Sequence, residues 1–334
     1  MKKKFFLYAA AAAAGVFFVS CGGLNLPKGS FAEIKEIPPS YMDKSFLMPD
    51  AVSLMYWEDG RFYKNDILSR SSEWESAGEF ELKNFHIKMK GEDGETRLDA
   101  KRMTHISYSD DKKLMGFTMK LGTSVNSTIG IADTAAREII FSEPVKKREK
   151  SQMSMSGIIL EKIFFKPVFS ENGKYACYGY IGQEEKRNVR VRKLDGNRGY
   201  FDIKEAARYA VFNGRVFVIQ KGAEDSVHEV NYYELEGGKN KSGKIAGFNE
   251  PIHTIISSGR SVFVMSNDNI YRLNAEGGAD KIYDMEPLKQ GFDKFGIYYV
   301  FAAAVEEKEY IFLYARTQKE EKYRWIMYGG DFSG

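Results

Sequence analysis

Three short turns decide the fold of this chain, and they recur at regular intervals: Asn172-Gly173-Lys174, Asn213-Gly214-Arg215 and Ser258-Gly259-Arg260. Each precedes a run of aromatic and β-branched residues, such as Val216-Phe217-Val218-Ile219, which is typical of a strand. Asn-Gly pairs accept positive φ readily and therefore form tight hairpin turns. The three glycines are about 41 and 45 residues apart, close to the ~40–50 residues of one four-stranded propeller blade.

A second turn follows within each of these units, and it repeats with the same period. The three copies end in Leu194-Asp195-Gly196, Leu235-Glu236-Gly237-Gly238 and Leu273-Asn274-Ala275-Glu276-Gly277-Gly278. Their leucines are about 41 and 38 residues apart, so both turns of the unit keep the spacing of a propeller blade.

The same turn occurs earlier in the chain as Asp59-Gly60-Arg61. A weaker copy, Glu306-Glu307-Lys308, lies one period after the third turn, and Asp110-Asp111-Lys112-Lys113 fills the gap between Gly60 and Gly173. Six units then cover residues 45–334, and they resemble a divergent bacterial β-propeller without matching a named subfamily. We expect an all-β fold with about six, or seven, four-stranded blades. A β-sandwich or an irregular barrel is the alternative, because Gly-rich hairpins occur in any all-β protein.

The first 22 residues carry an export signal. Lys2-Lys3-Lys4 is followed by an uncharged apolar stretch from Phe5 to Val19. Fifteen residues is short for a membrane-spanning helix, which needs about 20, and matches the apolar region of a secretory signal. Residues 1–20 are therefore predicted to be a signal peptide.

The sequence at the end of this stretch, Phe18-Val19-Ser20-Cys21, resembles the lipobox of bacterial lipoproteins, with Phe18 in place of the usual Leu. The resemblance implies that Cys21 is acylated by diacylglycerol and becomes the mature N-terminus, so that acyl chains hold the protein on a membrane. Gly22 is not the Asp that retains such proteins at the inner membrane, which favours the outer membrane. An ordinary signal peptide with an incidental Cys21 is the alternative.

Residues 21–44 are expected to be the lipidated cysteine, a flexible tether through Ser30 and an irregular lead-in with Pro38-Pro39. Helical turns are expected only at residues 132–138 and 204–209. Of the 334 residues, 43% are hydrophobic and 14% aromatic, which favours β structure. The formal charge of +3 belongs to the three signal lysines. A neutral mature domain offers no electrostatic case for binding nucleic acid.

No motif in the sequence predicts a catalytic centre, a metal site or a cofactor. The four histidines, His86, His105, His228 and His253, are far apart in the sequence, whereas zinc sites usually show closely spaced pairs. His253 is expected in an innermost strand, held by a structural hydrogen bond. Cys177 lies in an alternating strand and is expected to be a buried, inert thiol.

Two basic segments have ordinary explanations. The run Gly238–Ile245 resembles a phosphate-binding loop but has Ile245 where the motif needs Ser or Thr, so a solvated hairpin turn is expected. Lys146-Lys147-Arg148-Glu149-Lys150 is expected to be a loop between blades, with contact to anionic lipid headgroups as the alternative.

Two functions follow from these features. The first is a lipid-anchored module of the cell envelope, not an enzyme, that binds or scaffolds a protein (or a glycan) partner. Its rim aromatics, such as Trp57, Trp74 or Trp325, would anchor the interface, although burial between blades is the commoner place for them. The second is a carbohydrate-active envelope enzyme, which requires acidic residues and a His converging on the central channel.

Overall fold

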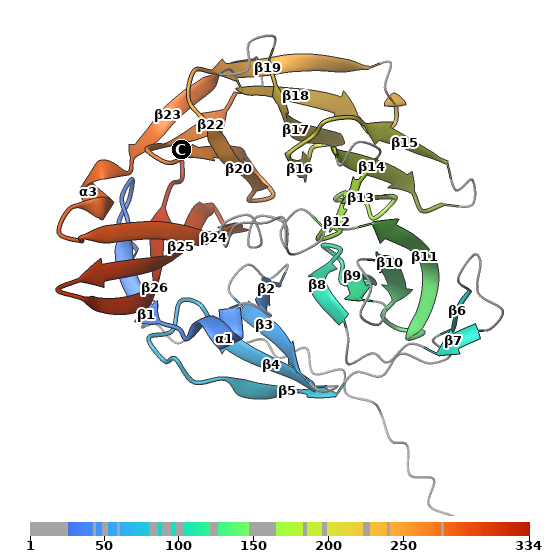
Figure 1. Cartoon of the computed structure of the whole chain (residues 1–334), viewed down its shortest axis with the longest axis horizontal. Helices are drawn as coiled ribbons and strands as arrows, with labels where there is room; N and C mark the ends of the chain where they lie inside the picture. The colour runs from blue at the N-terminus through green and yellow to red at the C-terminus, as the bar shows by residue number, and fades with distance from the viewer. Residues whose placement is uncertain are drawn as a thin grey trace, which may run out of the picture.

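The computed structural model describes residues 26–42, 45–48, 53–58, 61–79, 86–88, 95–97, 103–120, 126–146, 165–182, 186–195, 199–222, 228–238, 241–274 and 277–334. Six four-stranded antiparallel sheets surround a central axis (Figure 1). The all-β, six-bladed propeller predicted from the turn spacing is therefore confirmed. The sandwich, the irregular barrel and a seventh blade are excluded by this sheet arrangement.

We number the blades by the order of their first strands, from the innermost strand outward. The first blade contains β2 (Ser45–Leu47), β3 (Ser53–Glu58), β4 (Arg61–Asp66) and β5 (Glu75–Glu79). The second contains β8 (Met103–Tyr108), β9 (Leu114–Lys120), β10 (Asn126–Asp133) and β11 (Glu138–Lys146). The third contains β12 (Val168–Phe169), β13 (Tyr175–Ile181), β14 (Arg187–Lys193) and β15 (Tyr200–Ile203).

The remaining blades follow the same order. The fourth contains β16 (Arg208–Phe212), β17 (Arg215–Lys221), β18 (His228–Glu234) and β19 (Ser242–Phe248). The fifth contains β20 (Ile252–Ser257), β21 (Val262–Ser266), β22 (Asn269–Leu273) and β23 (Ala279–Asp284). The sixth contains β24 (Lys294–Val305), β25 (Lys308–Lys319), β26 (Lys322–Asp331) and, from the other end of the chain, β1 (Ala32–Glu36).

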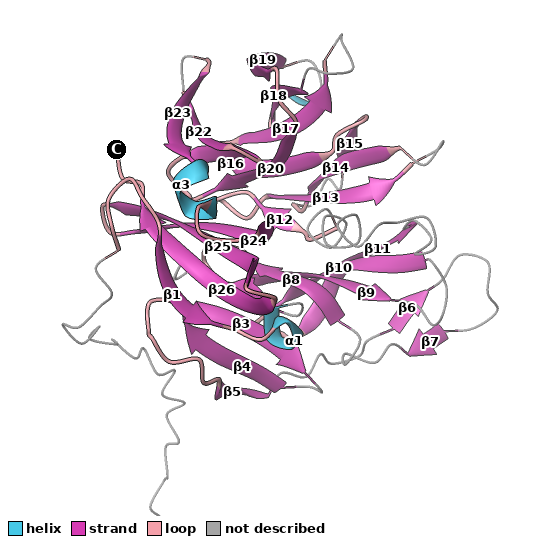
Figure 2. Ribbon diagram, turned by 60° about the vertical axis from the view of Figure 1, so that its left-hand side comes forward, coloured by secondary structure: helices cyan, strands magenta, loops and turns pink. Residues whose placement is uncertain are grey.

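The N-terminal segment closes the ring. β1 pairs antiparallel with β26 as the outermost strand of the sixth blade (Figure 2). Leu26 is buried, and the Gly29 N–H donates to the Asp331 carbonyl at 2.7 Å. The expected irregular lead-in and the tether through Ser30 are therefore wrong over these residues. They pair because β26 would otherwise leave a row of unpaired backbone groups on a sheet edge.

The turn between the first and second strands has the same chemistry in the second and third blades. Ser109 Oγ donates to Asp111 Oδ1 at 2.7 Å, and Ser170 Oγ donates to Asn172 Oδ1 at 2.8 Å. The same hydroxyls accept the Leu114 and Tyr175 N–H groups, each at 3.0 Å. A serine that bonds to its own turn fixes the hairpin locally.

Asp59-Gly60 lies outside the described residues, and its place in the chain shows that it does not belong to this series. It connects β3 to β4, the second and third strands of the first blade, whereas Gly173, Gly214 and Gly259 connect first strands to second strands. The first unit predicted from the sequence is therefore out of phase with the first blade. The stretch of chain between the first and second blades is also longer than the others, because it contains a separate hairpin of β6 (His86–Lys88) and β7 (Glu95–Arg97).

The hydrophobic core lies between neighbouring blades. One buried cluster joins the third and fourth blades through Val189, Val191, Val216 and Val218, and another joins the fourth and fifth through Phe217 and Val264. Trp57 is buried, and Trp74 and Trp325 are half-buried against Tyr56 and Tyr314. The three tryptophans thus stabilise the contacts between blades and are not exposed anchors.

The only helices of the described residues are single turns, α1 (Pro39–Met42) and α3 (Glu286–Lys289). The helical turns expected at residues 132–138 and 204–209 are instead strand ends and hydrogen-bonded turns. In this part of the chain, no helix has the length and apolar character needed to cross a membrane.

Candidate functional site

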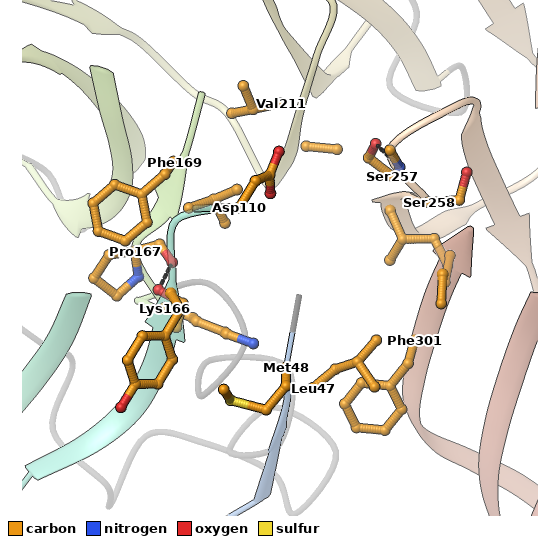
Figure 3. Close-up of a pocket in the computed structure, with 18 of the residues that line it drawn as sticks. Leu47, Met48, Asp110, Lys166, Pro167, Phe169, Val211, Ser257, Ser258 and Phe301 are labelled. Atoms are coloured by element: carbon orange, nitrogen blue, oxygen red, sulfur yellow. Dashed lines mark hydrogen bonds between the residues drawn. The ribbon is translucent and has the colours of Figure 1, made fainter. Parts of the chain in front are cut away.

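The innermost strands of all six blades line a central channel with a cavity of about 350 Å³ (Figure 3). Each contributes at least one apolar side chain to the wall: Leu47, Ile106, Val168, Val211, Ile255 and Phe301. Small ligands usually bind to concave, mainly apolar surfaces that carry a few polar groups. The channel is therefore the candidate functional site.

Lys166 directs its side chain toward the centre of this channel (Figure 3). It immediately precedes β12, and Leu47 and Met48, from β2 and the segment after it, line the same part of the cavity (Figure 3). Burial lowers the pKa of Lys166 to about 8. Within the described part of the chain, no carboxylate oxygen lies within 4 Å of its ammonium group.

The backbone around Lys166 is held from both sides. Ser107 and Thr118 of the second blade donate to the carbonyls of Pro167 and Phe165, at 2.5 and 3.0 Å. Tyr209 of the fourth blade donates to the Lys166 carbonyl at 2.5 Å. Because hydrogen bonds from two neighbouring blades fix this segment, the Lys166 side chain starts from a rigid point in the wall.

Two carboxylates line the other end of the cavity. Asp110 and Glu171 occupy equivalent positions in the first turns of the second and third blades. The pKa of Asp110 is raised by partial burial and by the negative charges of Glu171 and Asp111. Glu171 accepts the backbone N–H of Asn213, which links the third blade to the fourth.

His105 also lines the channel, from an irregular point in β8. Its φ is +54°, and the pairing of β8 with β9 shifts register between Thr104 and Ser107. A bulge of this kind reorients side chains. The His105 Nδ1 lies 2.9 Å from Thr104 Oγ1. The wall of the channel thus carries His105, Asp110, Glu171 and Lys166, none of which the sequence singled out as a site.

The fold resembles solved propellers at low sequence identity. The structure titled "Kluyveromyces lactis Hsv2 complete loop 6CD" matches with a TM-score of 0.50 and 11% identity, covering 86% of this chain and 74% of that chain. The β-propeller domain of the Trilobed protease from Pyrococcus furiosus gives a TM-score of 0.44 and 10% identity, covering 81% and 79%. A putative TolB from Agrobacterium tumefaciens gives 0.41 and 11%, covering 72% and 80%.

No protein-family model matches the chain, and no curated protein matches it either. At identities near one residue in ten, likeness between structures extends to the fold alone. Function must therefore be argued from the residues of the channel and of the N-terminal segment.

The two cysteines differ in whether the structure describes them. Cys21 and the preceding Phe18, Val19 and Ser20 lie outside the described residues. Cys177 is fully buried in β13 as a free thiol, as predicted, and burial raises its pKa. A thiol with a raised pKa forms little thiolate and is a poor nucleophile.

His253 lies in β20, the innermost strand of the fifth blade, as expected. Its pKa is lowered by burial first and then by His228 and Arg208. Its Nε2 is buried with no hydrogen-bond partner among the described residues, so this atom does not make the structural hydrogen bond expected of His253.

The two basic segments correspond to a turn and a strand end. Gly238 lies in the hairpin turn between β18 and β19, as predicted, and residues 239–240 lie outside the described part. The second half of the run is not a turn, because Ser242–Ile245 form the start of β19. Lys146 ends β11, and residues 147–150 lie outside the described part. Among the described residues, no group of three or more His, Cys, Asp or Glu side chains is placed to hold a metal ion.

Proposed function

We propose that this protein is a lipid-anchored propeller of the bacterial cell envelope that binds a partner, a protein or a glycan, and is not an enzyme. The observation that carries the proposal is the lipobox-like Phe18-Val19-Ser20-Cys21 placed just before a closed propeller. Acyl chains on Cys21 would hold the domain on a membrane, and Gly22 favours the outer membrane.

The position of β1 gives the anchored domain an orientation. The chain joins the propeller beside Asp331, on the face that carries the turns between first and second strands; we call this the first-turn face. Cys21 precedes the buried Leu26 by only five residues, a reach of at most about 18 Å. Under the proposal, the first-turn face lies toward the membrane and the opposite face is presented to the partner.

The anchor is tested by replacing Cys21 with alanine. We expect the Cys21→Ala protein to incorporate no labelled palmitate and to leave the membrane fraction, with at least a tenfold loss from membranes, because no acyl chain remains. Cys177→Ala is the matched control and should label and fractionate like the wild type, since Cys177 is buried in β13. Equal labelling of the wild type and Cys21→Ala would show that the anchor is absent.

The orientation is tested by placing a photo-crosslinking residue on each face in intact cells. Asn267 is exposed in the β21–β22 turn of the opposite face, and Lys174 is exposed in the β12–β13 turn of the first-turn face. We expect Asn267 to crosslink a specific envelope partner and Lys174 to crosslink lipid. Recovery of no partner from Asn267 above an untagged control, or of the same partner from Lys174, would contradict this arrangement.

The placement of His105, Asp110 and Glu171 along one channel favours a second candidate, a carbohydrate-active enzyme. A glycosidase needs two carboxyl groups flanking the scissile bond, and one of them needs a raised pKa to act as an acid. The pKa of Asp110 is raised, as this role requires. Release of reducing ends from envelope glycans by the wild type, but not by Asp110→Asn, would establish the enzyme over the binding module.

A further inference from the structure

The charges along the channel wall are separated into two ends. Lys166 lies before the first strand of the third blade, and Glu171 lies after it, with Asp110 beside Glu171. Lys166 and Glu171 are five residues apart with β12 (Val168–Phe169) between them, so their Cα atoms are at most about 18 Å apart. Between them the wall is mainly apolar, with side chains such as Val168, Phe169 and Phe301. The cavity is therefore cationic at one end and acidic at the other.

The ammonium group of Lys166 has no counter-ion within the described residues, and burial disfavours its charge. An unpaired charge in an apolar wall is costly unless something compensates it. Its backbone is fixed by Ser107, Thr118 and Tyr209, so the group is presented to the cavity in a fixed direction. A negative group entering the channel would pair with this ammonium and form a charge-assisted hydrogen bond.

The size of the cavity limits the ligand. About 350 Å³ corresponds to roughly a dozen water-sized groups at ~30 Å³ each. We propose that the channel is a binding site for a small monocarboxylate with an apolar body, whose carboxylate pairs with Lys166 and whose body lies along the innermost strands. The carboxylate comes from a fatty acid or from the C-terminal residue of an apolar peptide. Asp110 and Glu171 repel a second negative group, so dicarboxylates bind more weakly.

The test measures binding by calorimetry at pH 7 with size-matched probes on the full mature chain. Decanoate represents the fatty acid and N-acetyl-leucine the peptide terminus, each compared with its own amide. We expect at least one carboxylate to bind tenfold or more tightly than its amide. At pH 7 the carboxylate is ionised and offers a full negative charge to Lys166, whereas the amide is neutral. Preference for decanoate identifies a lipid source, and preference for N-acetyl-leucine identifies a chain terminus.

Three variants complete the test. Lys166→Met should bind acid and amide equally, whereas Lys166→Arg keeps the charge and should retain most of the preference. Lys174→Met removes an exposed lysine of the same blade that does not line the channel and should bind like the wild type. Thermal unfolding checks that each variant is folded. Equal binding of acid and amide by the wild type, no binding of either carboxylate, or an unchanged preference in a folded Lys166→Met would overturn the proposal. None of these results bears on the lipid anchor.

Discussion

Replacing Lys35 by methionine should lower the free energy of unfolding by about 3 kcal/mol, one of the largest effects of any single side chain here. Lys35 lies in β1, on the sixth blade, yet its buried ammonium donates to the first blade. It bonds to Asn65 Oδ1 at 2.6 Å and to the carbonyls of Asp66, Ser69 and Ser71 at 2.5, 2.9 and 3.2 Å. Methionine leaves these acceptors without their donor and removes a link that closes the ring.

The measurement is urea unfolding at pH 7. Lys322→Met, which removes an exposed lysine from β26, is the matched control and should change stability by less than about 0.5 kcal/mol. If Lys35→Met is as stable as Lys322→Met, the ammonium does not hold the first and sixth blades together.

The pH dependence gives this prediction a second readout. Burial lowers the pKa of Lys35 to about 8, against 10.5 for an ordinary lysine, although Asp66 opposes the shift. Between these two pH values the unfolded chain binds more protons than the folded chain, so folding stability from this group rises with pH. The wild type should therefore gain up to about 3 kcal/mol relative to Lys35→Met as the pH rises from 8 to 10.5.

The second large effect is expected at Gly330, where the N-terminal segment crosses β26. A Cβ atom there would lie 2.2 Å from the Ser30 carbonyl oxygen and 2.7 Å from Phe332. A backbone oxygen cannot give way as a flexible side chain does. Gly330→Ala should therefore displace residues 26–30 and lower the free energy of unfolding by about 2–3 kcal/mol.

Gly296→Ala in β24 of the same blade is the control for this substitution. Its Cβ would meet Tyr298 at 3.8 Å, an ordinary contact, so the variant should be neutral or slightly more stable. Protease digestion reports the local effect, because only Gly330→Ala should expose residues 26–30 to cleavage. Similar stability and cleavage for the two variants would show that the N-terminal segment does not depend on close approach at Gly330.

The regular blades were predictable because residues close together in the chain determine their turns and strands. Ser170 and Asn172 bond to their own turn, and Gly173 and Gly214 have positive φ in theirs. The second strands are continuous apolar runs, such as Val216-Phe217-Val218-Ile219 in β17. The first unit was placed out of phase because Asp59-Gly60 has the same local chemistry but a different place in its blade. Turn chemistry identifies a hairpin and does not say which two strands of the blade it joins.

The channel was not predictable in the same way. Lys166 carries no motif, and its position depends on hydrogen bonds from Ser107 and Tyr209, which lie on two other blades. Asp110 and Glu171 belong to first turns, for which the sequence predicts a hairpin and no site. They meet at the channel only because the second and third blades are adjacent in the ring.

The all-β class, the blade period and the buried Cys177 follow from the sequence alone, which also predicts the lipid anchor at Cys21. Each of these depends on residues close together in the chain, where hairpin propensity, strand propensity and a short peptide motif act. The folded chain is needed to see that Ala32–Glu36 completes the sixth blade, that Lys35 links it to the first, and that Lys166 enters the channel. These contacts join residues that are distant in the chain, and closing the ring is what brings their partners within hydrogen-bonding distance.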